Sequence, residues 1–125
     1  MSGSLWQRGW AGLIESYDFG RIVIDGVTYT TDVIVLGDRV KDSWWRNEGH
    51  VLHVSDISDA VEAFAPEVVI VGTGYMGMMK VPKETAQYFQ TRGIELHVKK
   101  TKEACGLFNT LSKSKRALAG LHLTC

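Results

Sequence analysis

Short apolar runs in the first half of the chain predict β-strands. Residues 21–30 are typical of a hairpin, because Asp25-Gly26 readily adopts the positive φ angles of a two-residue type I′ turn. The turn predicts two opposed pairs of side chains: Ile24 with Val27, and Ile22 with Tyr29. The runs at 32–37 and 51–54 are apolar without alternation, which predicts strands that are buried on both faces.

The spacing typical of helices appears in the second half of the chain. Apolar side chains at i, i+3, i+4 and i+7 predict a helix over 57–64, which Ser55 or Asp56 can cap. A second helix is expected to begin at Pro82, which preorganises its first turn, and to end at Gly93, which supplies a left-handed residue. The apolar faces of these two helices consist of Ile57, Ala60, Val61 and Phe64, and of Ala86 and Phe89.

A third helix is expected to begin at Thr101, with this threonine as its N-cap. Its apolar face consists of Ala104, Leu107, Phe108 and Leu111. Strand-like runs between and after the helices occupy 68–72, 94–98 and 117–124. This alternation predicts parallel pairing through right-handed crossovers and leaves the direction of the last strand open. No linker divides the chain, so we expect one α/β domain over residues 1–125, in which residues 1–19 are an irregular or strand-forming N-terminal segment.

The composition agrees with a single globular domain. Hydrophobic residues make up 45% of the 125 residues and aromatic residues 10%, which suffices for a core. No run approaches the roughly 18–20 apolar residues of a membrane-spanning helix, and the N-terminal residues lack the pattern of a cleavable signal peptide. We therefore expect a cytoplasmic protein with no membrane span.

A net charge of zero conceals a polarity along the chain. Residues 1–91 carry 7 basic and 12 acidic side chains, a net charge of −5, whereas residues 92–125 carry 7 and 2, a net charge of +5. A basic segment of this kind can face an acidic partner or a phosphate. We do not expect nucleic acid as a partner, because nucleic-acid-binding domains are usually positively charged, with aromatic residues among the basic ones.

Residue types typical of catalysis or metal binding do not form a recognisable motif. Cys105 and Cys125 lie 20 residues apart without a CxxC motif, and Cys105 is expected to be a buried thiol. The four histidines form no HxxxH or HxH pair, and no serine lies in a GxSxG motif. We therefore predict no metal site, no cofactor and no catalytic residue.

The glycine loop, residues 72–77, follows a predicted buried strand, which is a position typical of phosphate and dinucleotide sites. It departs from the dinucleotide fingerprint, because the next helix begins only at Pro82 and no acidic residue ends the following strand. Two interpretations remain: a glycine turn that packs closely, or a cleft that binds a small anion. The residues expected to line that anion site are Gly72, Thr73, Gly74, Lys99, Thr101 and Asn109.

The sequence Trp44-Trp45-Arg46 is the second unusual feature. Adjacent residues of a strand point to opposite faces, so one tryptophan can lie in the core while the other is exposed or lines a groove. The alternative is that both are core residues, or that one covers the end of a barrel. An exposed tryptophan beside an arginine is typical of interaction hot spots. Met76 and Met78 add a flexible apolar rim to the glycine loop, so all five residues are predicted to contact a partner.

Several of these motifs, taken in order, resemble a small family of unknown biochemical function. The family has an archaeal prototype, and its animal members are named adipogenesis-associated proteins or mitochondrial complex I assembly factors. The resemblance rests on Ile24-Asp25-Gly26 with Tyr29, Trp44-Trp45-Arg46 followed by Gly49-His50, Val71-Gly72-Thr73-Gly74, Thr101 with Ala104 and Asn109, and Leu121-His122-Leu123-Thr124-Cys125.

The resemblance implies a compact three-layer α/β fold with a mostly parallel sheet and an N-terminal β-hairpin extension. It also implies that the glycine loop belongs to a cleft shared by the family, without implying a known reaction. The Arg- and Ser-rich presequence of mitochondrial relatives is missing at the N-terminus, which favours the cytoplasm.

Two functions follow as expectations. The first is a non-enzymatic interaction or assembly-factor-like protein with a protein partner. The second is a binder of a small anionic ligand, or an undiscovered enzyme, that uses the cleft at the glycine loop. The sequence leaves the oligomeric state open.

Overall fold

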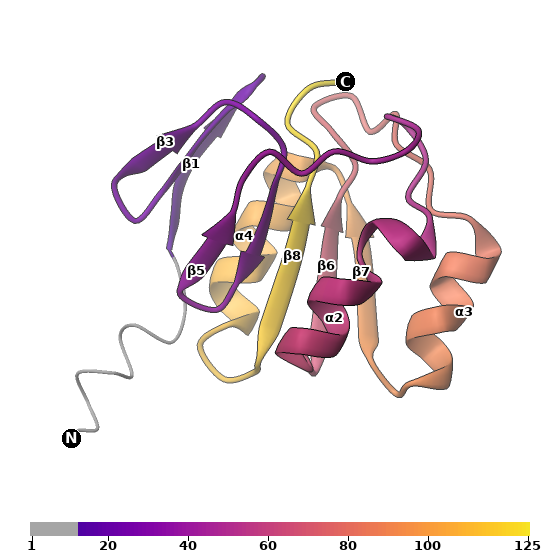
Figure 1. Ribbon diagram of the computed structural model, residues 1–125. Helices are drawn as coiled ribbons and strands as arrows, with labels where there is room; N and C mark the ends of the chain where they lie inside the picture. The colour runs from indigo at the N-terminus through magenta and orange to yellow at the C-terminus, as the bar shows by residue number, and fades with distance from the viewer. Residues whose placement is uncertain (1–12) are drawn as a thin grey trace.

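The computed structural model describes residues 13–125 as a mixed α/β domain with two sheets (Figure 1). The strands are β1 (Ile14–Asp18), β2 (Arg21–Ile24), β3 (Val27–Tyr29), β4 (Val33–Leu36), β5 (Arg39–Lys41), β6 (Val68–Gly72), β7 (Glu95–Lys99) and β8 (Ala117–Leu121). The helices are the 3₁₀ turn η1 (Val54–Asp56), α2 (Ser58–Phe64), α3 (Lys83–Thr91) and α4 (Thr101–Leu111). The expectation for residues 1–12 lies outside the described residues.

The smaller sheet has the order β1-β2-β3 and contains the predicted hairpin. Asp25 has φ 49° and Gly26 has φ 80°, both in the left-handed region that a type I′ turn requires. The opposed pairs are those predicted, Ile24 with Val27 and Ile22 with Tyr29. The turn therefore determines which side chains of β2 and β3 share a face.

The larger sheet has the order β5-β4-β8-β6-β7 and is mixed. The pairs β6–β7 and β6–β8 are parallel, as the crossover helices predict, whereas β4 is antiparallel to both β5 and β8. The expectation of a mostly parallel sheet is therefore wrong. The tight turn at Gly37, where φ is 61°, joins β4 to β5 without a crossover and permits only antiparallel pairing between them. The antiparallel β4–β8 pair joins strands distant in sequence, whose relative direction no local pattern specifies.

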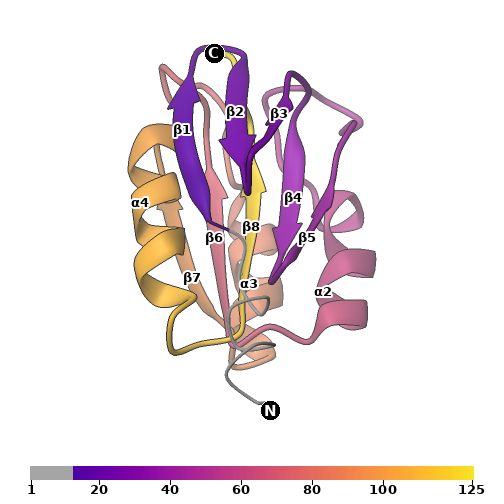
Figure 2. The same cartoon turned by 90° about the vertical axis from the view of Figure 1, so that its left-hand side faces the viewer.

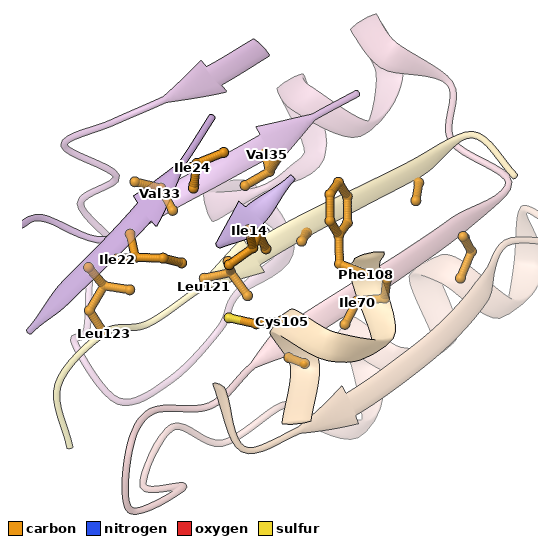
Figure 3. Close-up of a cluster of buried hydrophobic side chains, with 14 residues drawn as sticks. Ile14, Ile22, Ile24, Val33, Val35, Ile70, Cys105, Phe108, Leu121 and Leu123 are labelled. Atoms are coloured by element: carbon orange, nitrogen blue, oxygen red, sulfur yellow. The ribbon is translucent and has the colours of Figure 1, made fainter. Parts of the chain in front are cut away.

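Buried side chains cover both faces of the larger sheet. On one face, α4 and the smaller sheet enclose a cluster that includes Ile22, Ile70 and Phe108 (Figures 2 and 3). On the other face, α2 and α3 cover a second cluster that includes Trp44 and Phe89. The alternation of side chains along each strand supplies both clusters, which explains why the central strands are apolar throughout.

Two predicted local structures are wrong. Residues 51–54 form no strand: Val51 makes only isolated bridges, to Glu48 and Lys80, although Leu52 is fully buried. The apolar run therefore reports burial and not strand pairing, and its last residue, Val54, already begins η1.

The predicted helix caps are the second error. Neither Ser55 nor Asp56 caps α2, since the Asp56 carboxylate accepts the His53 N–H at 2.8 Å instead. Thr101 is the first residue of α4 and not its N-cap, because its hydroxyl bonds to other segments. By contrast, α3 begins directly after Pro82 and is followed by Gly93 with φ 68°, as predicted.

Candidate functional site

Four segments distant in sequence meet at the end of the larger sheet where β6, β7 and β8 terminate (Figure 1). They are the turn between β1 and β2, the irregular segment 42–53, the glycine loop and the residues after β8. Hydrogen bonds join them: Gly20 N–H donates to Leu123 O at 2.9 Å, and Lys80 N–H donates to His50 O at 2.7 Å. This end of the domain contains every residue predicted to bind a ligand or partner except Asn109.

Several backbone amides of the glycine loop, and that of Met78 just after it, are hydrogen-bonded within the chain. Four N–H groups donate as follows: Thr73 to Lys99 O at 2.9 Å, Gly74 to Thr101 Oγ1 at 2.8 Å, Tyr75 to Thr124 O at 2.7 Å and Met78 to Cys125 O at 2.9 Å. The segment after β8 thus lies along the loop and accepts hydrogen bonds from the Tyr75 and Met78 amides, while the amides of Thr73 and Gly74, in the predicted anion site, are bonded to Lys99 and Thr101.

Close packing explains the first two glycines of the loop. A Cβ on Gly72 would lie 2.8 Å from Thr101 Oγ1 and 2.9 Å from Leu121 Cδ2. Gly74 has φ 112°, and a Cβ there would lie 2.6 Å from Thr124 O. Both positions therefore require glycine because other parts of the chain occupy the space of a side chain.

The predicted anion site is only partly assembled. The Thr73 hydroxyl donates to Lys99 O at 3.1 Å, and the Thr101 hydroxyl accepts the Gly74 N–H at 2.8 Å. The Lys99 residue is exposed. Asn109 lies elsewhere, because its amide side chain makes two hydrogen bonds to the backbone of Ile14, at 2.9 and 2.8 Å. Asn109 thereby fastens α4 to β1.

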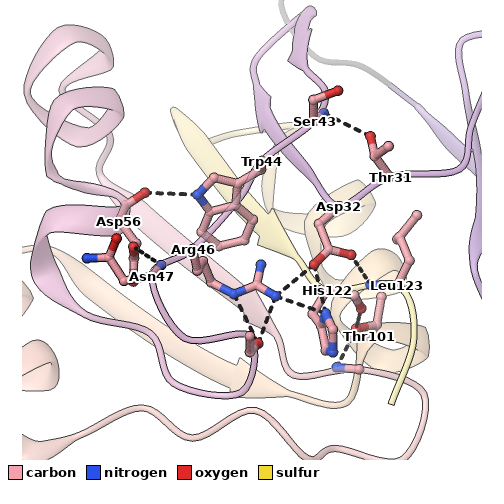
Figure 4. Close-up of polar contacts among 12 residues, drawn as sticks. Thr31, Asp32, Ser43, Trp44, Arg46, Asn47, Asp56, Thr101, His122 and Leu123 are labelled. Carbon is pink, nitrogen blue, oxygen red and sulfur yellow. Dashed lines mark hydrogen bonds and ion pairs between the residues drawn. The ribbon is translucent and has the colours of Figure 1, made fainter.

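A buried ion cluster, formed by Asp32, Arg46 and His122, lies beneath this end of the domain (Figure 4). Asp32 Oδ2 lies 2.8 Å from Arg46 Nη2 and 2.8 Å from His122 Nδ1. The side chains of Arg46, His122 and Asp32 are only 3%, 7% and 14% exposed. Arg46 also donates to Gly49 O at 2.8 Å, and Leu123 N–H donates to Asp32 Oδ1 at 2.7 Å. The cluster therefore joins β4, the segment 42–53 and the end of β8.

Hydrogen bonds keep the Asp32 carboxyl ionised. Burial raises the pKa of its carboxyl, but hydrogen bonds from His122, the Leu123 N–H and Arg46 together lower it more, so this pKa lies below its ordinary value. His122 Nδ1 lies 2.8 Å from Asp32 Oδ2, which can only accept, and 3.1 Å from Arg46 Nη2, which can only donate, so these two contacts favour opposite tautomers of the ring. His122 Nε2 is buried and has no hydrogen-bond partner among the described residues, and the His50 ring lies edge-on to it with centroids 5.5 Å apart.

A carboxylate that orients an imidazole is an arrangement that enzymes use to prepare a base. Here Nε2 is enclosed, so the arrangement in this structure positions segments of the chain. No local pattern along the chain marks the cluster, because its three members come from distant positions and meet only through the order of the strands. Arg46 and His122 belong to the motifs of the family resemblance, whereas Asp32 was not singled out.

The two adjacent tryptophans have opposite environments. Trp44 is 3% exposed and donates its ring N–H to Asp56 O at 2.9 Å (Figure 4). The guanidinium carbon of Arg46 lies 4.7 Å from the centroid of the Trp44 ring. Trp45 is 75% exposed. The prediction that one is a core residue and the other exposed is confirmed, although residues 42–46 are irregular and not a strand. Arg46, expected at the contact surface, belongs to the buried ion cluster.

Large apolar side chains remain exposed at this same end. We call them the apolar rim: Phe19 at 53% exposure, Trp45 at 75%, Tyr75 at 47%, Met76 at 63% and Met78 at 51%. The Tyr75 ring packs against Phe19, with centroids 5.8 Å apart, which joins the turn after β1 to the glycine loop. Five such residues around one end of a small domain form an unusually apolar surface.

The two cysteines also differ in exposure. Cys105 is buried in α4, as predicted, and burial raises the pKa of its thiol to about 12. Cys125 is exposed, beside the apolar rim, and its carbonyl oxygen accepts the Met78 N–H. Residues 13–125 contain no group of three His, Cys, Asp or Glu side chains placed to share a metal ion.

A family described as "Protein of unknown function (DUF498/DUF598)" matches residues 14–122. The chain belongs to this family. The match covers both sheets, the buried ion cluster and the glycine loop of this DUF498 protein, which confirms the resemblance to a family of unknown function.

Solved structures share this DUF498 fold. The conserved hypothetical protein PH1505 from Pyrococcus horikoshii OT3 is 29% identical, with a TM-score of 0.77 over 90% of this chain and 98% of its own. A protein described as an outer membrane protein from Bartonella henselae is 21% identical, with a TM-score of 0.77 over 94% of this chain and 98% of its own. A Bordetella pertussis protein described as a Mth938-like domain is 16% identical, with a TM-score of 0.63 over 90% of this chain and 85% of its own.

None of the helices in residues 13–125 has the length and apolar character that crossing a bilayer requires. A cytoplasmic location stays a prediction.

Proposed function

We propose that this DUF498 protein is a non-enzymatic interaction protein that binds another protein through the apolar rim. The observation that carries the proposal is the exposure of Trp45, Met76 and Met78 at one end of the domain, together with Phe19 and Tyr75. Burying a side chain of this size on binding contributes about 1.5–3 kcal/mol, so leaving five exposed is costly unless a partner covers them.

The residues beneath the apolar rim are held by packing and hydrogen bonds, which favours tight binding by the rim. Trp44 is packed and hydrogen-bonded next to Trp45, and the amides of Thr73, Gly74 and Tyr75 in the glycine loop are hydrogen-bonded within the chain. A surface residue held on a rigid base loses little conformational entropy on binding, which is a property of interaction hot spots. The methionines add side chains that adapt to the shape of a partner. Assembly of a larger complex is the form of this function that the family resemblance favours.

The pairing of the loop amides supports a protein partner over a small anion. An anion held by Gly72, Thr73, Gly74, Lys99, Thr101 and Asn109 would have to displace the carbonyl oxygens and the threonine hydroxyl that these amides now contact. Asn109 would also have to leave Ile14. These exchanges make the anionic ligand the second candidate.

Affinity capture with the full chain from its native host tests the proposal. We expect one recurrent protein partner, with recovery reduced about tenfold or more by Trp45→Ala, since hot-spot residues contribute at least about 2 kcal/mol. Val27→Ser is the matched control, because Val27 is 51% exposed on β3 and lies outside the rim. Recovery of the partner by Trp45→Ala at the level of the unchanged protein would contradict the proposal.

Thermal unfolding with a panel of small anions tests the second candidate. A ligand at about 100 times its Kd raises the free energy of unfolding by about 2.7 kcal/mol. We expect no such increase. A saturable increase that Lys99→Ala removes would favour the anion site instead.

A further inference from the structure

The strand β7 forms an open edge of the larger sheet. In the order β5-β4-β8-β6-β7 it pairs only with β6, and no other strand of residues 13–125 lies beyond it (Figure 1). Its five residues, Glu-Leu-His-Val-Lys, include neither proline nor glycine, and the opposite edge strand β5 has only three residues. β7 is thus the longer of the two edges on which another strand could pair.

The hydrogen-bond pattern identifies the backbone groups that face outward. Glu95 N–H donates to Glu67 O at 3.1 Å, and Lys99 O accepts the Thr73 N–H at 2.9 Å, so these two residues of β7 direct their backbone groups toward β6. Successive residues of a strand alternate in direction, and both groups of one residue in a parallel pair point the same way. The N–H and C=O groups of Leu96 and Val98 therefore point away from the sheet.

A hollow of about 390 Å³ adjoins this edge on the side of α3. Ala86 and Gln90 of α3 line it together with Ile94, Glu95 and Leu96. Val98, on the same face of β7 as Leu96, is 42% exposed. In Figure 1, α3 lies on the outer side of β7, away from β6, so it would cover a strand added to this edge. Apolar side chains of such a strand would fill the hollow.

The face of the β7 edge next to α4 carries more charged side chains than the face next to α3. A hollow of about 430 Å³ there is lined by Lys99, Lys102, Glu103, Gly106, Leu107 and Thr110. Among the described residues, Lys99 and Lys102 of this hollow form no ion pair, whereas Glu95 is paired with Lys115 at 2.8 Å. Two unpaired lysines against the single Glu103 favour acidic side chains on this side of an added strand.

We propose that the β7 edge binds an extended acidic segment of another protein as a sixth strand, with apolar and acidic residues alternating along that segment. Backbone hydrogen bonds to Leu96 and Val98 supply the pairing, and the two hollows on opposite faces select alternate side chains. This surface is separate from the apolar rim, so the proposal goes beyond the proposed function and does not depend on it.

A peptide segment fits this edge better than a second copy of the chain. Two copies that pair through β7 by a two-fold axis would place both α3 helices on the same face of the joined sheet. Each α3 already extends past its own β7, so the two helices would compete for the same strip of surface (Figure 1). An extended segment carries no such helix.

The test uses a nine-residue peptide in which valine and glutamate alternate. Amide NMR of the full chain should show saturable shifts at β7, and hydrogen exchange of the Leu96 and Val98 amides should slow by about tenfold or more in the complex. A peptide with lysine in place of glutamate should fail to bind, as should the acidic peptide with proline at its centre, because proline cannot donate a hydrogen bond.

Charge-reversal variants locate the site. The double variant Lys99→Glu with Lys102→Glu should lose binding about tenfold or more, since it places like charges in contact. Lys113→Glu, also an exposed lysine of the basic segment but outside both hollows, is the matched control and should bind as the unchanged protein does. Trp45→Ala should also bind normally, which separates this surface from the apolar rim.

Three results would overturn the proposal. The first is no binding of the acidic peptide at millimolar concentration, and the second is binding that the double charge reversal leaves unchanged. The third is a dimer of the unliganded protein in which the Leu96 and Val98 amides are already protected, which would make a second copy the occupant of the edge.

Discussion

The buried ion cluster and the apolar rim lie at the same end of the domain and invert the usual arrangement of protein interiors and surfaces. Asp32, Arg46 and His122 are charged or polar and buried, whereas Trp45 and Met76 are apolar and exposed. Buried ion pairs seldom add net stability, but removing one partner is strongly destabilising. The comparison indicates that the polar groups beneath the surface fix the backbone that presents the apolar groups above it.

The largest expected effect separates these two regions by stability. Arg46→Ala leaves the buried Asp32 carboxylate without its charged partner and should lower the free energy of unfolding by about 3–5 kcal/mol. Trp45→Ala should change it by no more than about 0.5 kcal/mol, because Trp45 is exposed. Urea unfolding of both variants measures the difference. Equal losses would show that the rim is part of the stabilising framework and not a free surface.

The pH dependence of stability tests the ion cluster itself. The folded state lowers the pKa of Asp32, so this group stabilises the fold above its unfolded pKa, about 3.9, and the contribution is lost as the pH falls through the lower folded value. The stability difference between the unchanged protein and Asp32→Asn should therefore be largest near neutral pH and shrink below about pH 4.

Glu95 is a second carboxylate that could contribute to the acid-dependent loss of stability, because hydrogen bonds from Lys115 and His97 lower its pKa as well. The variant Glu95→Gln is therefore the control for Asp32→Asn. Glu95→Gln should retain the part of the acid-dependent loss that Asp32 causes. A stability difference for Asp32→Asn that stays constant from about pH 7 to about pH 3 would contradict the assigned role of the carboxylate.

The smallest expected effect is a difference in chemical reactivity between the two cysteine thiols, which involves no change in the free energy of unfolding. The buried Cys105 thiol, with its pKa raised to about 12, should not react with a thiol reagent at about pH 8, whereas the exposed Cys125 should. Mass spectrometry should find one added label in the folded protein and two in urea. Cys125→Ser should take up no label while folded, and a label on Cys105 under those conditions would show that α4 opens readily.

Local signals predicted most of the fold. The Asp25-Gly26 turn and the boundaries of α3 depend on the conformational preferences of neighbouring residues, and both are confirmed. The direction of β4 depends on strands distant in sequence, and the expectation of a mostly parallel sheet was wrong there. The strand predicted at 51–54 failed for a related reason, since an apolar run reports burial without specifying a hydrogen-bond partner.

The candidate site was less predictable than the fold. The contrast between Trp44 and Trp45 could be expected from their adjacency, but which of them is buried depends on the Asp56 carbonyl and on the end of β8. Asp32 carried no signal, because its role comes from partners at positions 46 and 122. Pairing of the loop amides depends likewise on residues 124 and 125, which only the folded chain brings there.

The central place of β8 constrains the order in which the chain can fold. β8 lies between β4 and β6, and its register joins Val33 to Leu121, near opposite ends of the described chain. Until β8 has been synthesised and inserted, the β4–β5 and β6–β7 pairs have no common partner, and each retains an open edge. Such long-range pairing is slow, and open edges are aggregation-prone. Completion of the larger sheet therefore has to wait for β8, the last of its strands along the chain.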